Sequence, residues 1–235
     1  MTRALEGKLA LVTGASRGIG AAIAEALGAQ GAHVVLVART SGGLEDVEAR
    51  IHAAGGSATI APLDLTDGDS IAKLGHAISG RWSALDVLVL NAAMLGTLTP
   101  VPHIAPKEFA ALLTLNVTAQ QALIAAFDPL LRASEDARII GITSSVGRMP
   151  RAYWGAYGAS KAAFETLLGA YAEEMRQIGR VKLAIVDPGA TATKMRAQAY
   201  PGEDPTTLKQ PSAVAQVVLR LATAAYETGH RERVD

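Results

Sequence analysis

The sequence contains no cysteine among its 235 residues, which excludes disulfide bonds, thiolate metal ligands and cysteine nucleophiles. It also lacks an excess of charge of either sign, because 22 Lys and Arg residues balance 22 Asp and Glu residues. This balance argues against a nucleic-acid-binding surface. The five histidines are scattered without the spacing of metal ligands, so no metal site is expected.

Long apolar runs are missing as well. Leu85–Leu90 and Val181–Val186 have the length of a strand and are far too short to span a bilayer. Residues 1–7 lack the apolar core of a signal peptide. We therefore expect a cytoplasmic protein that does not act at a membrane. The composition, 49% hydrophobic and 19% charged, suits one large globular domain spanning residues 1–235.

Short apolar segments alternate with helical patterns along the chain. This alternation predicts a single doubly wound α/β domain, Rossmann-like, with a parallel sheet covered by helices on both faces. The expected strands are Lys8–Thr13, Val34–Ala38, Ala58–Ala61, Leu85–Leu90, Arg138–Ile142 and Val181–Val186. The expected helices are Ala21–Gln30, Leu44–Ala54, Asp67–Ser79, Pro106–Leu131, one that begins near Gly155, and Ser212–Tyr226.

A loop bearing Gly14, Gly18 and Gly20 joins the first expected strand to the first helix. Glycine permits a tight turn and a close approach of backbone to a pyrophosphate, and a helix N-terminus offers N–H groups to an anion. The G-x-x-x-G-x-G spacing differs from the commoner G-x-G-x-x-G fingerprint. The loop therefore predicts a dinucleotide site, and a purely structural connection is the alternative.

The second expected strand ends at Arg39, where NAD-selective folds place an acid that bonds the ribose 2′-hydroxyl. With Arg17 of the glycine loop, Arg39 could bind a 2′-phosphate through charge-assisted hydrogen bonds. We therefore expect NADP(H) to be preferred over NAD(H), unless both arginines are only solvated surface residues.

Polar residues follow the later strands, at the sheet edge where open α/β folds bind ligands. Asp64 could accept a hydrogen bond from an adenine amino group or cap the next helix. Ser144 follows the fifth strand. Thr191 and Thr193 could bond a carboxamide or cap the turn that follows. Beyond them, Ala197–Gln210 has the composition of a mobile loop that could close over a substrate.

Tyr157 and Lys161 lie four residues apart in the small-residue run GAYGASK, so on a helix both side chains share one face. An ammonium group about 4 Å from a phenol in a partly dry site favours the phenolate by roughly three pKa units. The pair is therefore a candidate acid/base catalyst. The alternative is an ordinary pair of helix-surface residues. Asn116, in an apolar helical pattern, is by itself more typical of a core hydrogen-bonding residue.

Taken together, the motifs resemble the short-chain dehydrogenase/reductase superfamily, and the likeness covers nearly the whole chain. They are TGASRGIG (Thr13–Gly20), Asp64-Leu65, NAA (Asn91–Ala93), Asn116, Ser144, YGASK (Tyr157–Lys161) and PGATAT (Pro188–Thr193). The stretches around the last two look like a bacterial subgroup of oxidoreductases. The charged end of the chain, Glu227–Asp235, looks like a truncated version of the usual last strand, so a seventh strand is expected to be short or missing.

The resemblance implies hydride transfer between a nicotinamide and a carbonyl or secondary alcohol. Tyr157 would be the general acid/base, Ser144 would hold the substrate oxygen, Lys161 would bond the nicotinamide ribose, and Asn116 would hold a water. It also implies a homodimer or homotetramer. The cofactor would contact Gly14, Ser16, Arg17, Gly18, Ile19, Gly20, Arg39, Asp64, Leu65, Asn91, Ala92, Tyr157, Lys161, Pro188, Gly189, Thr191 and Thr193.

A non-catalytic dinucleotide-binding sensor or scaffold is the alternative function, although such a protein is expected to lack part of the Ser, Tyr and Lys set. The substrate is expected to be a small hydrophobic ketone, aldehyde or secondary alcohol. This expectation rests on an apolar and aromatic candidate wall of Leu95, Met149, Tyr153, Trp154, Met195 and Tyr200. Arg148 and Arg151 could bind an anionic substrate group or face solvent.

Overall fold

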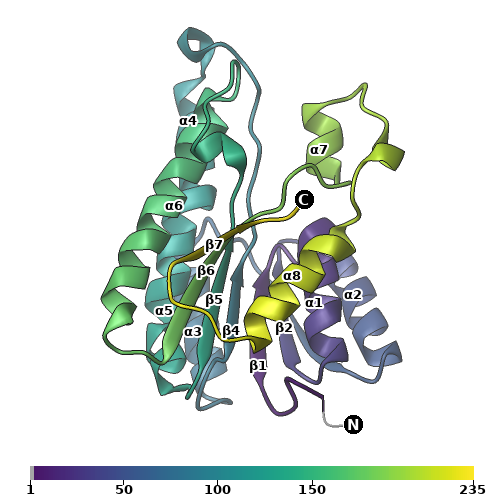
Figure 1. Ribbon diagram of the computed structural model, residues 1–235, viewed down its shortest axis with the longest axis vertical. Helices are drawn as coiled ribbons and strands as arrows, with labels where there is room; N and C mark the ends of the chain where they lie inside the picture. The colour runs from purple at the N-terminus through teal and green to yellow at the C-terminus, as the bar shows by residue number, and fades with distance from the viewer. Residues whose placement is uncertain (1–2) are drawn as a thin grey trace.

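The computed structural model describes residues 3–235 and contains one seven-stranded sheet (Figure 1). The strand order is β3-β2-β1-β4-β5-β6-β7, and each neighbouring pair is parallel. The chain builds outward from β1 to β3 and then returns to the other side of β1 with β4. This reversal is the doubly wound topology, so the predicted fold is confirmed.

The first half of the chain forms β1 (Leu9–Thr13), α1 (Gly18–Ala29), β2 (His33–Ala38), α2 (Ser41–Ala53), β3 (Ser57–Pro62), α3 (Gly68–Ser79) and β4 (Val87–Leu90). The second half forms η1 (Val101–His103), α4 (Pro106–Leu113), the π-helical η2 (Thr114–Thr118), α5 (Ala119–Ala133), β5 (Ala137–Ile142), η3 (Ser145–Gly147), α6 (Gly155–Arg176), β6 (Val181–Asp187), α7 (Lys194–Ala199), η4 (Pro205–Thr207), α8 (Pro211–Thr223) and β7 (His230–Arg233).

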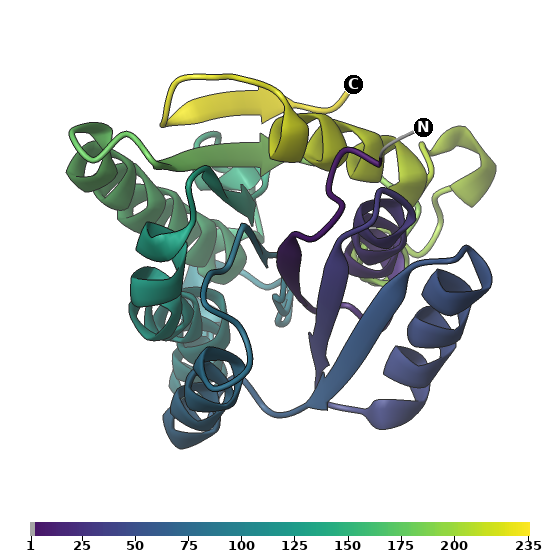
Figure 2. The ribbon, with the colours of Figure 1, turned by 90° about the horizontal axis from the view of Figure 1, so that it is seen from below.

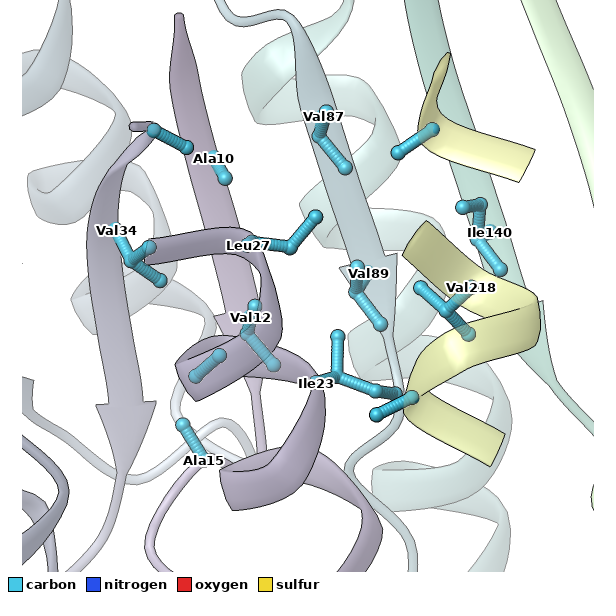
Figure 3. Close-up of a cluster of buried hydrophobic side chains, with 14 of the residues drawn as sticks. Ala10, Val12, Ala15, Ile23, Leu27, Val34, Val87, Val89, Ile140 and Val218 are labelled. Carbon is cyan, nitrogen blue, oxygen red and sulfur yellow. The ribbon is translucent and has the colours of Figure 1, made fainter. Parts of the chain in front are cut away.

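Helices cover both faces of the sheet: α1, α2 and α8 lie on one face, and α3, α5 and α6 on the other (Figures 1 and 2). Successive side chains of a strand point to opposite faces. In β1, Ala10 and Val12 accordingly join the cluster under α1 and α8, which also contains Ile23 and Val218 (Figure 3), whereas Leu11 joins the opposite cluster. Burial on both faces explains why the strands are apolar throughout.

Three segments differ from their predictions or complete them. The helix predicted over Pro106–Leu131 is divided by the π-helical turn η2, which contains Asn116. The predicted mobile loop Ala197–Gln210 contains the end of α7 and the short η4 and is otherwise irregular and largely exposed, with an Arg196–Glu203 ion pair at 2.5 Å across its first part. The seventh strand is present and short, and it pairs with β6.

Candidate active site

Tyr157 and Lys161 lie on the first two turns of α6, at the carboxyl ends of the strands. Both are buried, with exposed fractions of 6% and 3%. The Lys161 Nζ lies 5.8 Å from the centre of the Tyr157 ring and donates a hydrogen bond of 2.9 Å to the carbonyl oxygen of Ile142, the last residue of β5. The helix therefore places both side chains on one face, as the spacing predicts.

The segment that follows Ser144 packs directly against the turn of α6 that bears the pair. A Cβ atom at Gly158 would lie 2.9 Å from the carbonyl oxygen of Val146, and one at Gly147 would lie 3.0 Å from the backbone nitrogen of Ala162. The small residues of the helix thus allow backbone to approach backbone. Val146 shares a buried cluster with Tyr157, so Ser144 is brought to the same end of the sheet.

The electrostatics of the pair differ from the prediction. Burial, above all, raises the pKa of the Tyr157 hydroxyl, and the charge of Asp187 raises it further. Burial lowers the pKa of Lys161 from 10.5 to about 8, and the charge of Glu165 opposes that shift. The predicted lowering of the Tyr157 pKa is wrong for this structure, because the Lys161 ammonium group faces the end of β5 while the phenol contacts the sulfur of Met195 at 3.9 Å.

Asn116 is a buried residue whose side-chain hydrogen bonds go to protein groups. Its Oδ1 accepts from the Met94 backbone N–H at 2.9 Å, and its Nδ2 donates to the Met94 carbonyl at 2.9 Å and to the Ser160 hydroxyl at 3.0 Å. The amide thus ties the segment after β4 to α6. This geometry is that of a core hydrogen-bonding residue, the alternative that the sequence left open.

The glycine loop has the backbone geometry that the sequence predicts. Gly14 and Gly18 have φ of 66° and 57°, a region that favours glycine. A Cβ atom at Gly20 would lie 2.2 Å from the Gly14 carbonyl oxygen and 2.6 Å from Nδ2 of Asn91. Asn91 donates to the Thr13 carbonyl at 2.9 Å, and its own N–H donates to the Thr13 hydroxyl at 3.0 Å. Asn91 therefore fixes the loop to the end of β4.

The side chains of the glycine loop have separate environments. Arg17 precedes α1 and is exposed, whereas Ile19 packs against the core. Ser16 lies against the first turn of α2, where a Cβ atom at Gly43 would be 3.0 Å from its own Cβ. Arg39, which follows β2, is also exposed. Both arginine side chains are thus open to solvent.

Asp64 does not cap α3, because that role belongs to Asp67, whose side chain accepts from the Asp69 N–H. The Asp64 carboxylate instead accepts from the Thr66 N–H and hydroxyl at 2.9 and 2.8 Å. These bonds, with a smaller contribution from Arg39, hold its pKa below the ordinary value. Of the other residues in this region, Leu65 is buried in the core, and the Ala92 carbonyl accepts from Gln120 at 3.1 Å.

The segment after β6 is held by local hydrogen bonds to its threonine hydroxyls and to Asp187. Thr191 donates to the Pro188 carbonyl at 2.9 Å, and the Gly189 N–H donates to Asp187 at 3.0 Å. Thr193 caps α7 by accepting from the Arg196 N–H at 3.1 Å. Thr193 therefore acts as a helix cap, which is one of the two roles that the sequence left open.

Apolar side chains pack around Tyr157, but they include only part of the predicted substrate wall. Leu95, Trp154 and Met195 pack in the Tyr157 cluster, and Tyr200 lies 5.8 Å from the Trp154 ring. Met149 and Tyr153 are 54% and 60% exposed, so they do not belong to this buried cluster. The two candidate arginines also have protein partners: Arg148 pairs with Glu165 and Arg151 contacts the Ser145 hydroxyl.

Two residues of the site lie outside the sequence predictions. The Thr13 hydroxyl joins β1 to the end of β4, and Glu165 is a buried acid on α6. A signal existed for Glu165, because it lies four residues after Lys161 and hence on the same helix face. Within residues 3–235, no three His, Asp or Glu side chains come together as a metal site would require.

Comparison with known proteins identifies relatives over the whole chain. A family profile described as short chain dehydrogenase matches residues 8–204. The oxidoreductase YciK of Escherichia coli (strain K12) is 36% identical over 220 residues, covering 92% of this chain and 86% of YciK. A Pseudomonas syringae protein assigned to the short chain dehydrogenases superimposes with a TM-score of 0.96 at 39% identity, covering 100% and 97% of the two chains. An Escherichia coli CFT073 protein of the same assignment, solved with NADPH, has a TM-score of 0.95 at 34% identity and coverage of 100% and 99%.

The doubly wound sheet, the glycine turn at its first crossover and the buried Tyr-x-x-x-Lys pair define an oxidoreductase of the dinucleotide-binding class. Within that class, the chain belongs to the short-chain dehydrogenase family, as its motifs indicate.

Proposed function

We propose that the protein is an NADP(H)-dependent oxidoreductase that transfers hydride between the nicotinamide and a carbonyl compound or secondary alcohol. The observation that carries the proposal is the buried pair of Tyr157 and Lys161 at the strand ends, with Ser144 on the adjoining segment. A titratable hydroxyl in apolar, water-poor surroundings and near a cation is an arrangement suited to proton transfer to a substrate oxygen.

The glycine loop fits a dinucleotide on steric grounds. Gly18 has positive φ, and the nearest atom to an added Cβ is the Thr193 methyl group at 3.6 Å, so backbone N–H groups at the start of α1 are accessible to a pyrophosphate. Arg17 and Arg39 would hold the 2′-phosphate, which is the basis for preferring NADP(H). The relative solved with NADPH supports this preference.

The remaining cofactor contacts come from the loops at the same sheet edge. We propose Gly14, Ser16, Ile19, Gly20, Asp64, Leu65, Asn91, Ala92, Pro188, Gly189, Thr191 and Thr193 for adenosine, pyrophosphate and nicotinamide, with Tyr157 and Lys161 at the nicotinamide ribose.

NADPH, when bound, supplies the hydride to the carbonyl carbon. As that C=O bond becomes a C–O single bond, Tyr157 donates its proton to the oxygen. The raised pKa of Tyr157 keeps the phenol protonated at neutral pH, which is the form that reduction needs. Ser144 holds the same oxygen by a hydrogen bond and fixes its distance from the phenol. Asn116 positions α6 through Ser160, and a bound water there remains part of the proposal.

The proposed substrate is a hydrophobic ketone, aldehyde or secondary alcohol, because Leu95, Trp154 and Met195 pack around Tyr157. Binding of an apolar ligand against such side chains is favourable, because it removes apolar surface from water. Since Arg148 is already paired with Glu165, an anionic substrate group is not part of the proposal.

We also propose a cytoplasmic homodimer or homotetramer. Within the described residues, the continuous stretch Pro106–Ala133 is the one helix long and apolar enough to cross a membrane, yet this test is also passed by core helices of soluble proteins. Only 28% of its most apolar window is buried within the chain, so a second copy of the chain is a suitable cover for its outer face. Light scattering on the purified protein gives the subunit number directly.

A screen of NADPH oxidation over a broad panel of carbonyl compounds tests the function. Reduction of apolar ketones or aldehydes is expected, with slower turnover when NADH replaces NADPH. The alternative of a non-catalytic sensor requires thermal stabilisation by NADPH without reduction of any compound in the panel. That result would reject the proposed reaction while leaving the cofactor site intact.

A further inference from the structure

A buried carboxylate on α6 joins three segments around the active site. Glu165 is only 4% exposed. Its Oε1 accepts a hydrogen bond from the Thr143 hydroxyl at 2.6 Å, and its Oε2 pairs with Nη1 of Arg231 at 2.5 Å and with Nε of Arg148 at 3.3 Å. These partners belong to the end of β5, to β7 and to the segment after η3. One carboxylate thus connects the end of the central sheet to the last strand.

The position of this acid relates it to the catalytic pair. Glu165 lies four residues after Lys161, on the same face of α6, and Thr143 is the residue directly before Ser144. Burying a carboxylate is costly unless it is paired and hydrogen-bonded. The arginine side chains remain 52% and 38% exposed, so water could solvate them without the acid. The buried cation with the greater need of a nearby negative charge is Lys161.

We propose that Glu165 is a positioning residue of the active site, whose carboxylate fixes the end of β5 next to Ser144 and supplies the counter-charge that keeps the Lys161 ammonium group ionised. The inference rests on the proposed role of Lys161 at the cofactor ribose. Lys161 loses its proton with a pKa of about 8, and the charge of Glu165 resists that loss. Without Glu165, Lys161 would lose its proton at a lower pH.

Other charged and titratable groups surround Glu165 and Lys161 and lie on the elements packed around them. They are Tyr157 on α6, Asp187 at the end of β6, Arg148 after η3 and Arg231 on β7. Removal of the Glu165 charge takes away the nearby negative charge that favours the ionised form of Lys161, and it leaves the charges of Arg148 and Arg231 unpaired. Both changes act in one direction, toward a neutral Lys161.

The test is Glu165→Gln, which keeps the side-chain shape and an oxygen that can accept from Thr143. NADPH affinity is measured by fluorescence titration from pH 6 to 10. In the wild type, affinity should fall about tenfold as Lys161 changes from a charged to a neutral donor. In Glu165→Gln the midpoint of that fall should move to a pH about one to two units lower. Side chains four residues apart on a helix lie about 6 Å apart, and at an effective dielectric of 20 the lost attraction between the two charges corresponds to a shift of this size. Glu173→Gln, on the exposed face of the same helix and paired with Arg176, is the matched control with an unchanged profile.

A second variant keeps the test decisive if Glu165→Gln folds poorly. Arg231→Gln removes a partly exposed cation that offsets the Glu165 charge, so the midpoint should move to higher pH. Midpoints that stay at the wild-type value in these variants, even if their melting temperatures fall, would show a purely structural role and overturn the inference. Lys161→Met separates the two proposals. If this variant binds NADPH with the affinity and pH profile of the wild type, the proposed function of Lys161 itself is rejected. If it loses the pH dependence while the midpoints of Glu165→Gln and Arg231→Gln stay unshifted, only the role of Glu165 is rejected.

Discussion

Replacing Asn116 by alanine tests the junction between the segment after β4 and α6. The side chain is 1% exposed and makes three hydrogen bonds, two to the backbone of Met94 and one to Ser160. Alanine would remove a partner from the buried Ser160 hydroxyl and from two partly buried backbone groups of Met94, at about 1–1.5 kcal/mol each, so the free energy of unfolding should fall by roughly 3–4.5 kcal/mol. A loss of this size corresponds to a fall in melting temperature of roughly 8–15 °C for a chain of this length.

The assay is denaturant unfolding followed by circular dichroism, with calorimetry as a second probe. Thr118→Ala is the matched control, because Thr118 lies in the same π-helical turn and is exposed, and it should change the free energy of unfolding by less than about 0.5 kcal/mol. A loss below about 1 kcal/mol in Asn116→Ala would refute the assignment of Asn116 as a buried junction.

The other predictions concern the glycine loop, the cofactor phosphate and the buried lysine. Gly20→Ala should destabilise the fold by about 3 kcal/mol, because the added Cβ atom would lie 2.2 Å from the loop backbone. Gly169→Ala, in the middle of α6, should stabilise the fold by up to about 1 kcal/mol, because its added Cβ atom would meet no neighbouring atom within 4 Å. Equal effects of the two substitutions in melting experiments would contradict this prediction. Arg39→Ala should weaken NADPH at least about tenfold and spare NADH, while equal losses in titrations would reject the 2′-phosphate role. The pKa of Lys161 falls from 10.5 to about 8 on folding, so between pH 8 and 10.5 the unfolded chain binds more protons than the folded chain. The free energy of unfolding of the wild type should therefore rise with pH in this range, by about 3 kcal/mol in total relative to Lys161→Met. A difference between the two proteins that does not change with pH would contradict the burial of a charged lysine.

The sheet could be predicted because its signals are local. Strands such as Val87–Leu90 are apolar at every position and end at small or polar residues, which distinguishes buried parallel strands from surface strands. The order of the elements then fixed the topology, since parallel strands need a crossover between them. The placement of Tyr157 and Lys161 could be predicted for the same reason, because spacing alone puts both side chains on one face of α6.

What could not be predicted depends on contacts between distant segments. The π-helical turn at Thr114–Thr118 has no periodicity of its own, and Asn116 within it bonds to the segment after β4. Thr191 and Thr193 have equivalent sequence signals, but only Thr193 stands at the start of a helix. The sequence places Lys161 beside Tyr157 but does not reveal that its ammonium group faces the end of β5. The pKa of the phenol therefore could not be inferred from spacing.

The central claim is that the Tyr157 hydroxyl moves the proton during hydride transfer, and Tyr157→Phe measures it most directly. The ring remains in its apolar cluster while the titrating group is removed, so NADPH affinity should fall by no more than about tenfold, as the loss of one hydrogen bond to the ribose implies, while carbonyl reduction falls at least about 100-fold. Turnover close to wild type, with the variant folded and NADPH bound, would contradict the account.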